Sequence, residues 1–200
     1  KRPLVPPPYS QPLSDYPPIK IALLLLEWVH RDLSFNEISL LLRTQFMTSN
    51  ETVGRCKLEL YLRRLPEQPW SPINISHLFR KIAKEADGYK WLEGIQYISP
   101  FQVDPLERAS PAAWADRIDA LLQQLAWPGT RKLVGDELQL INRWRELLNE
   151  LARLEIICPK LTFSETSNHL ILLANKTIYQ LEAQLDIVQL LRPLEAVGTK

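Results

Sequence analysis

The chain has 200 residues, enough for one large domain or two small ones with a sizeable buried core. Its hydrophobic content of 46% and charged content of 24% are those of an ordinary globular protein and exclude an intrinsically disordered one. With 24 basic and 23 acidic side chains the net charge is only +1, far from the basic excess of a dedicated nucleic-acid-binding protein. Any contact with DNA must therefore come from a local patch.

The two cysteines, Cys56 and Cys158, are too few and too far apart for a disulfide framework or a paired zinc site. The longest apolar run, residues 21–26, is far shorter than the roughly 20 residues that cross a bilayer. We therefore expect a reduced, cytoplasmic protein without a membrane partner. Because the chain begins at Lys1, in a proline-rich stretch, we interpret it as a piece of a longer polypeptide.

The first predicted element is an extended, proline-rich lead-in over residues 1–14, because prolines lack the amide donors that helices and sheets use. Asp15 is expected to cap a first helix that has Pro17 and Pro18 in its opening turn. Residues 19–29 are apolar almost all round, which indicates a helix buried on several sides.

A capping box at residues 34–37, Ser-Phe-Asn-Glu, predicts the start of a short second helix. A third helix is expected over residues 50–64. The apolar spacing of this third helix predicts which of its side chains face inward, namely Val53, Cys56, Leu60 and Tyr61.

Prolines break the pattern after residue 65, and Ser76 is expected to cap a further helix over residues 78–86. Residues 88–104 have no regular pattern. We therefore place a sub-boundary of the domain near residues 66–108.

The second half predicts long helices. Ser110 and Pro111 are a strong start signal, and the helix that they open ends at residues 127–129, Trp-Pro-Gly. Residues 135–154 carry a sustained inward stripe that includes Trp144. The last predicted elements are a helix opened by a capping box at residues 162–165 and ending at Leu173, and a short strand over residues 187–191.

The predicted fold is therefore mainly α, an irregular bundle of about seven helices with proline-rich loops and at most one short strand near the C-terminal end. Its domain organisation is a lead-in over residues 1–14, a helical domain over 15–186, and the beginning of a following domain over 187–200.

Familiar catalytic patterns are missing. No glycine is followed by the Lys-Ser or Lys-Thr of a nucleotide-binding loop, and no lysine has an acid two positions before it, as metal-dependent recombination nucleases require. The acid pairs 116/119 and 146/150 are interpreted as solvated surface, and Trp114 and Trp144 as core. We therefore expect no catalytic, cofactor-binding or metal-binding residue. The three histidines, likewise interpreted as non-catalytic, are His30, His77 and His169.

One stretch favours an interaction. Across residues 43–64, five basic side chains stand against only two acids, Glu51 and Glu59. Brought together by folding, they would form a modest phosphate-binding patch, although an ordinary basic surface explains the same residues. The candidate DNA-binding residues are Arg43, Arg55, Lys57, Arg63 and Arg64.

Several segments, in collinear order over most of the chain, resemble a group of bacterial proteins called probable DNA repair proteins. Residues 41–47, LLRTQFM, are similar to the family's LLRSPFL, and residues 188–198, VQLLRPLEAVG, to its VQVLGLLEAAG. Residues 127–131, WPGTR, are similar to WPGER, with Ala126 where the family has a glycine. Further similarities lie at residues 12–17, 22–26, 55–64, 114–115, 137–139 and 144–148, and the resemblance is weakest across residues 66–108.

This family is itself similar to RecB and AddB, superfamily 1 helicases fused to a nuclease. In such proteins the matching region is a helical accessory domain inserted into the second motor domain. The resemblance therefore implies an ATP-dependent helicase or exonuclease as the parent, acting in DNA end processing, with ATP and magnesium bound elsewhere in it. Residues 187–200 would begin the next strand of the motor domain. None of the family's catalytic motifs matches this chain.

Two functions fit these observations. The first is a non-catalytic accessory domain that helps to position DNA or the motor domains, with DNA and other domains of the same polypeptide as partners. The second is a purely structural helical domain that docks on other proteins and does not contact DNA. A third interpretation, a free-standing hydrolase, rests only on a scattered serine and the histidines.

Overall fold

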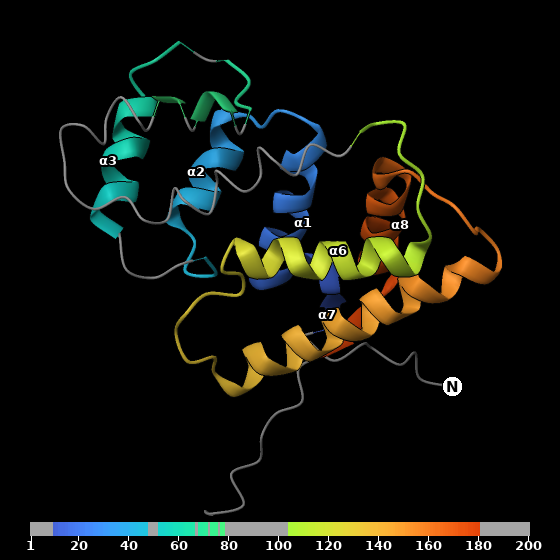
Figure 1. Cartoon of the computed structure of the whole chain (residues 1–200). Coiled ribbons are helices and arrows are strands. Elements are labelled where there is room, and N and C mark those ends of the chain that lie inside the picture. Colours follow the sequence, from blue (N-terminus) through green and yellow to red (C-terminus); the bar gives the residue numbers. More distant parts are fainter. Residues whose placement is uncertain are drawn as a thin grey trace, which may run out of the picture.

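The fold comes from a computed structural model, and within the described residues it is mainly helical, as the sequence predicts (Figure 1). The described residues are 10–47, 52–66, 68–71, 73–75, 77–78 and 104–180.

The elements follow one another in a simple order. A short strand and a 3-10 turn precede the first long helix, and a second 3-10 turn and a second strand flank the last one. In chain order they are β1 (Ser10–Pro12), η1 (Leu13–Asp15), α1 (Pro17–His30), α2 (Phe35–Arg43), α3 (Thr52–Leu62), α6 (Pro111–Gln124), α7 (Gly135–Arg153), η2 (Leu154–Ile156), α8 (Phe163–Lys176) and β2 (Ile178–Gln180).

Helix α1 lies at the centre of the bundle, with α2 and α3 to one side and α8 to the other, while α6 and α7 run across its lower end in the view (Figure 1). It packs against α6, α7 and α8, and almost its whole apolar surface is buried, as its sequence predicts. The indole rings of Trp114 on α6 and Trp144 on α7 are fully buried between these helices. The indole N–H of Trp127, which follows α6, donates to the Pro18 carbonyl of α1 at 2.9 Å.

The predicted helix starts are confirmed at three places and wrong at one. Ser34, Ser110 and Thr162 are N-caps whose side chains accept backbone N–H groups of the first turn. The first helix, however, is capped by Tyr16 and not by Asp15, which lies in η1. The reason is local: a residue before proline avoids the helical region, so Tyr16 takes the extended cap geometry before Pro17.

The two ends of the helical unit are joined by a two-stranded antiparallel ribbon, which we call the neck. In it Ser10 pairs with Gln180 and Pro12 with Ile178. The expectation that prolines keep this segment out of a sheet was therefore wrong for residues 10–12, because a proline fits an edge strand whose amide is not needed. The neck continues into η1, where the Leu13 N–H donates to the Thr177 carbonyl at 2.8 Å.

The inward face of α3 differs from the prediction. Leu58 and Leu62 are buried, whereas Cys56 is exposed and Leu60 is 59% exposed. Helix α3 has apolar residues on two faces, so spacing alone does not decide which is inward. Tertiary contacts decide which face is inward. Arg55 and Glu59 lie on the same face as Leu58 and Leu62, and both are buried with hydrogen-bond partners in other parts of the protein.

The other predicted elements are confirmed or lie outside the described residues. Helix α7 has the expected bounds to within one residue. Helix α6 begins at Pro111 as predicted but ends at Gln124, three residues before the predicted stop at Trp127, and α8 runs one turn beyond the predicted Leu173. Strand β2 occupies a segment where no strand is predicted. The predicted strand at 187–191 and most of the helix after Ser76 lie outside the described residues, as does the irregular segment at 88–103.

Candidate nucleic-acid interface

The predicted basic patch lies on α2, on α3 and on the turn after α3. Helices α2 and α3 pack side by side (Figure 1). Arg43 is the last residue of α2, Lys57 is on α3, and Arg63 and Arg64 follow its end. All four side chains are exposed. Folding therefore gathers four of the five predicted residues on neighbouring elements, although they are spread over 22 positions of the sequence.

Arg55, the fifth residue, is a correction to the predicted patch. It is only 6% exposed, and its Nη1 donates to the Thr44 carbonyl at 2.6 Å. A buried guanidinium must be satisfied by hydrogen bonds inside the protein, so its donors are turned toward the interior. Arg55 therefore supports the segment after α2 and is not available to a phosphate at the surface.

A buried carboxylate organises two of the exposed arginines. Glu59 Oε1 accepts from Arg63 Nη2 at 2.8 Å and lies 3.5 Å from Arg43 Nε, while the buried Ser39 hydroxyl donates to the same oxygen. We call these four residues the Glu59 cluster. In the sequence analysis Glu59 is only one of two negative charges in the stretch. The one local signal of its ion pair with Arg63 is the spacing of four residues between them.

The electrostatics of the Glu59 cluster follow from that geometry. Burial of Glu59 by itself opposes ionisation, but the hydrogen bonds from Arg63 and Ser39 and the charge of Arg43 outweigh it, so the pKa of the carboxyl is lowered. The side chains of Arg43 and Arg63 remain 61% and 53% exposed. Each therefore has one side fixed on the carboxylate and another turned to solvent.

A cleft of about 510 Å³ lies beside Arg43, between the start of α1 and the end of α2. Lys20 of α1 lines it together with Arg43, so a fifth exposed basic residue joins the edge of the patch. Asp15 also lines the cleft and reduces its positive charge. The sequence does not reveal Lys20 as a candidate, because 22 residues and a whole helical connection separate it from Arg43.

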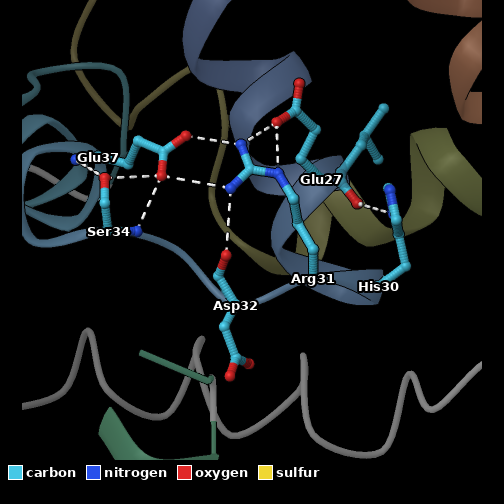
Figure 2. A network of polar contacts seen from close by, with 7 residues as sticks. Glu27, His30, Arg31, Asp32, Ser34 and Glu37 are labelled. Carbon is cyan, nitrogen blue, oxygen red and sulfur yellow. Dashed lines mark hydrogen bonds and ion pairs between the residues drawn. The ribbon is translucent and has the colours of Figure 1, made fainter. Parts of the chain in front are cut away.

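The start of α2 is held by a polar network around Arg31 (Figure 2). The Arg31 guanidinium donates to Glu27 and to Glu37 Oε1, the latter at 2.6 Å, and Glu37 Oε2 accepts the Ser34 backbone N–H at 2.8 Å. The hydrogen bond from Arg31 lowers the pKa of Glu37 to about 2, with a further contribution from Ser34. This network fixes the direction in which α2 leaves α1, and so the place of the Glu59 cluster.

Replacing Glu37 by glutamine should lower the stability of the protein by about 0.5–1 kcal/mol at neutral pH, because the cap contact with Ser34 remains while the partly exposed ion pair with Arg31 is lost. The folded carboxyl has a pKa below the ordinary 4.5, so its contribution is complete above that pH and is lost as pH falls toward 2. Urea unfolding at pH 7 and at pH 2.5 measures the difference in stability between Glu37→Gln and the parent protein. An equal difference between Glu37→Gln and the parent at both pH values would contradict this assignment.

A scan of the sequence against models of known protein families found no match, and searches of curated proteins and of solved structures found no significant match either.

Three of the remaining polar residues singled out by the sequence have local partners, namely Glu146, Glu150 and His30. Glu146 and Glu150 both bind Arg143, with distances of 2.9 and 2.8 Å. The Nδ1 atom of His30 lies 3.2 Å from the Leu26 carbonyl, and its ring meets Phe163 edge-on. Among the described residues there is no group of three or more His, Cys, Asp or Glu side chains that could hold a metal ion. No described helix is long and apolar enough to cross a membrane.

Proposed function

We propose that this chain is a non-catalytic accessory helical domain of an ATP-dependent DNA repair helicase–nuclease, and that it contacts DNA through the α2–α3 surface. The observation that carries the DNA contact is the Glu59 cluster with its two exposed arginines; Lys57 and Arg64 are exposed on α3 and on the turn after it. Among the described residues of this stretch, four exposed cations stand against the one buried carboxylate of Glu59, and such an excess suits a phosphate backbone. ATP and magnesium are bound elsewhere in the parent protein under this proposal.

The neck supports an accessory domain of the inserted kind. Because β1 and β2 pair, the chain comes into the helical unit and leaves it at the same point. The ring of Tyr16 meets that of Tyr179 edge-on with centroids 6.1 Å apart, and its hydroxyl donates to the Tyr179 carbonyl. Adjacent ends are what allow a domain to be inserted into another without disturbing it.

The conformation of one residue adds to the resemblance. Ala126 has φ of 55°, in the left-handed region that favours glycine. Glycine is the residue that stands at this position in the similar family segment. A backbone shape that suits glycine at that place is consistent with a common local fold.

The DNA contact is tested by titrating labelled duplex and forked DNA with the full chain at low and high salt. The double variant Lys57→Glu/Arg64→Glu spares the Glu59 cluster and should lower the affinity about tenfold or more at low salt, with a shallower salt dependence. Arg145→Glu/Arg153→Glu, which reverses two exposed charges on α7, is the matched control and should change little. Absence of binding at low salt, or equal losses in both variants, would rule out the DNA contact.

A second candidate, a domain that docks on other proteins without touching DNA, is favoured by an exposed apolar pair. Ile156 and Ile157, in the turn after α7, are 90% and 78% exposed. Exposed apolar side chains in one place are typical of an interface. If the titration shows no DNA binding while Ile156→Ser/Ile157→Ser reduces self-association of the chain, this candidate replaces the first.

A further inference from the structure

A hollow of about 260 Å³ opens next to the Glu59 cluster, between the start of α2, the end of α3 and the segment that follows α3. Its walls combine aromatic and aliphatic surface with two polar side chains at the protein's exterior. We call it the Phe35–Arg63 hollow. The lining residues that matter for its chemistry are Phe35, Asn36, Leu62, Arg63, Leu65 and Trp70.

Arg63 links this hollow to the Glu59 cluster. Its Nη2 donates to Glu59 Oε1 at 2.8 Å, and its guanidinium carbon lies 5.7 Å from the centre of the Phe35 ring. The guanidinium is thus fixed at one nitrogen by a carboxylate and attracted to an aromatic ring. A planar cation held in this way, and still 53% exposed, is a flat platform at the rim of an apolar hollow.

The other lining residues extend that chemistry. Phe35 is half-buried and contributes part of its ring, and the apolar walls are Leu62, Leu65 and the ring of Trp70. Asn36 is exposed and carries an amide, which both donates and accepts hydrogen bonds. A flat apolar surface, a planar cation and an amide together match a flat heteroaromatic group with polar edges.

We propose that the Phe35–Arg63 hollow binds an unpaired nucleobase of the DNA strand whose phosphates contact Arg43 and Arg63. This inference rests on the proposed DNA contact and specifies that the bound DNA has unpaired bases. Unpaired bases are recognised by stacking on aromatic rings and on arginine planes, with hydrogen bonds to their edges. A paired base cannot enter, because its flat faces are covered by its neighbours in the stack.

The size of the hollow agrees with one base. Pockets for drug-sized ligands measure roughly 300–1,000 Å³, so a hollow of about 260 Å³ holds a single small ring system. Charge favours a nucleotide over an aromatic side chain of a partner protein, because Arg63 lines the hollow, Arg64 is the next residue along the chain, and Arg43 binds the same carboxylate as Arg63. All three side chains are exposed and suit the phosphates of the strand that carries the base.

The consequence is a preference for single-stranded or forked DNA over blunt duplex. The test compares three labelled ligands with the full chain at low salt: a thymidine oligonucleotide, an abasic strand of the same length, and a blunt duplex. The abasic strand presents the same phosphates without bases. We expect the thymidine strand to bind about five- to tenfold more tightly than the abasic strand, the lower end of what stacking one base contributes.

Two conservative variants locate the effect. Arg63→Lys keeps the charge but removes the flat guanidinium. The readout is the ratio of the thymidine-strand affinity to the abasic-strand affinity, and this variant should bring that ratio close to one. Arg64→Lys, the same change at the neighbouring exposed arginine, is the matched control and should keep the preference. Phe35→Leu repeats the first result without touching a charge, and circular dichroism checks that each variant is folded.

The outcomes separate the two levels of the proposal. Equal binding of the thymidine and abasic strands overturns the base-binding hollow but leaves the phosphate contact standing. A preference that survives Arg63→Lys and Phe35→Leu also overturns it. No binding of any of the three ligands removes the DNA contact, and the inference with it.

Discussion

Replacing Trp114 by alanine should lower the free energy of unfolding by about 3–5 kcal/mol, as expected for deletion of a buried tryptophan. Its ring is fully buried between α6 and the start of α8, where it meets Phe163 edge-on at 5.5 Å. Its indole N–H donates to the Leu161 carbonyl at 2.7 Å, and the Arg117 guanidinium carbon lies 4.3 Å from the ring centre. Urea unfolding followed by circular dichroism measures the loss.

The matched control is Trp144, which is also fully buried but whose indole N–H has no acceptor within the described part of the chain. Phenylalanine at either position removes similar volume, but only Trp114→Phe also removes a hydrogen bond. Trp144→Phe relieves an unsatisfied donor instead. We expect Trp114→Phe to cost about 1–2 kcal/mol more than Trp144→Phe. Equal costs for the two variants would mean that the bond to Leu161 contributes nothing to stability.

These tryptophans also show what the sequence can predict about this fold. Trp114 and Trp144 stand on long apolar stripes behind clear start signals, so local patterns alone identify their helices and their burial. The same holds for the capping boxes at Ser34 and Thr162. In each case the signal lies within one helix, and nothing distant has to be known.

Helix α3 shows where such prediction ends. The stripe through Cys56 and Leu60 and the stripe through Leu58 and Leu62 are equally apolar, and the choice between them depends on contacts with α2. A wrong face also means a wrong place for Arg55, which the prediction put in the basic patch. Which face of such a helix is buried depends on its contacts with residues far away in sequence, and the spacing within the helix carries no information about those contacts.

The candidate interface was predictable to the same degree. The local excess of basic residues pointed to Arg43, Lys57, Arg63 and Arg64, all of which the structure brings to the surface of neighbouring elements. The contact of Arg43 and Arg63 with one carboxylate joins the end of α2 to the end of α3. The Phe35–Arg63 hollow likewise needs both helices, so neither feature has a signature within a single segment.

Replacing Gly129 by alanine should lower the free energy of unfolding by about 2–4 kcal/mol, because two costs combine. Gly129 has φ of 101°, a conformation that side chains rarely adopt, so alanine strains the backbone there. A Cβ atom at this position would also lie 2.8 Å from the Gln45 carbonyl oxygen, a backbone atom that cannot turn away. Urea unfolding measures the sum.

The opposite change in the same turn is the control. Ala126 has φ of 55°, and Ala126→Gly should raise the stability by about 0.5–1 kcal/mol, because relief of left-handed strain exceeds the entropy cost of glycine. Opposite signs at two positions three residues apart distinguish backbone geometry from general sensitivity of the turn. Because Gln45 follows Arg43 by two residues, Gly129→Ala also strains the segment that carries the basic patch. If Gly129→Ala lowers the free energy of unfolding by less than about 1 kcal/mol, the turn can shift away from the segment around Gln45. The close approach of the two would then contribute little to stability.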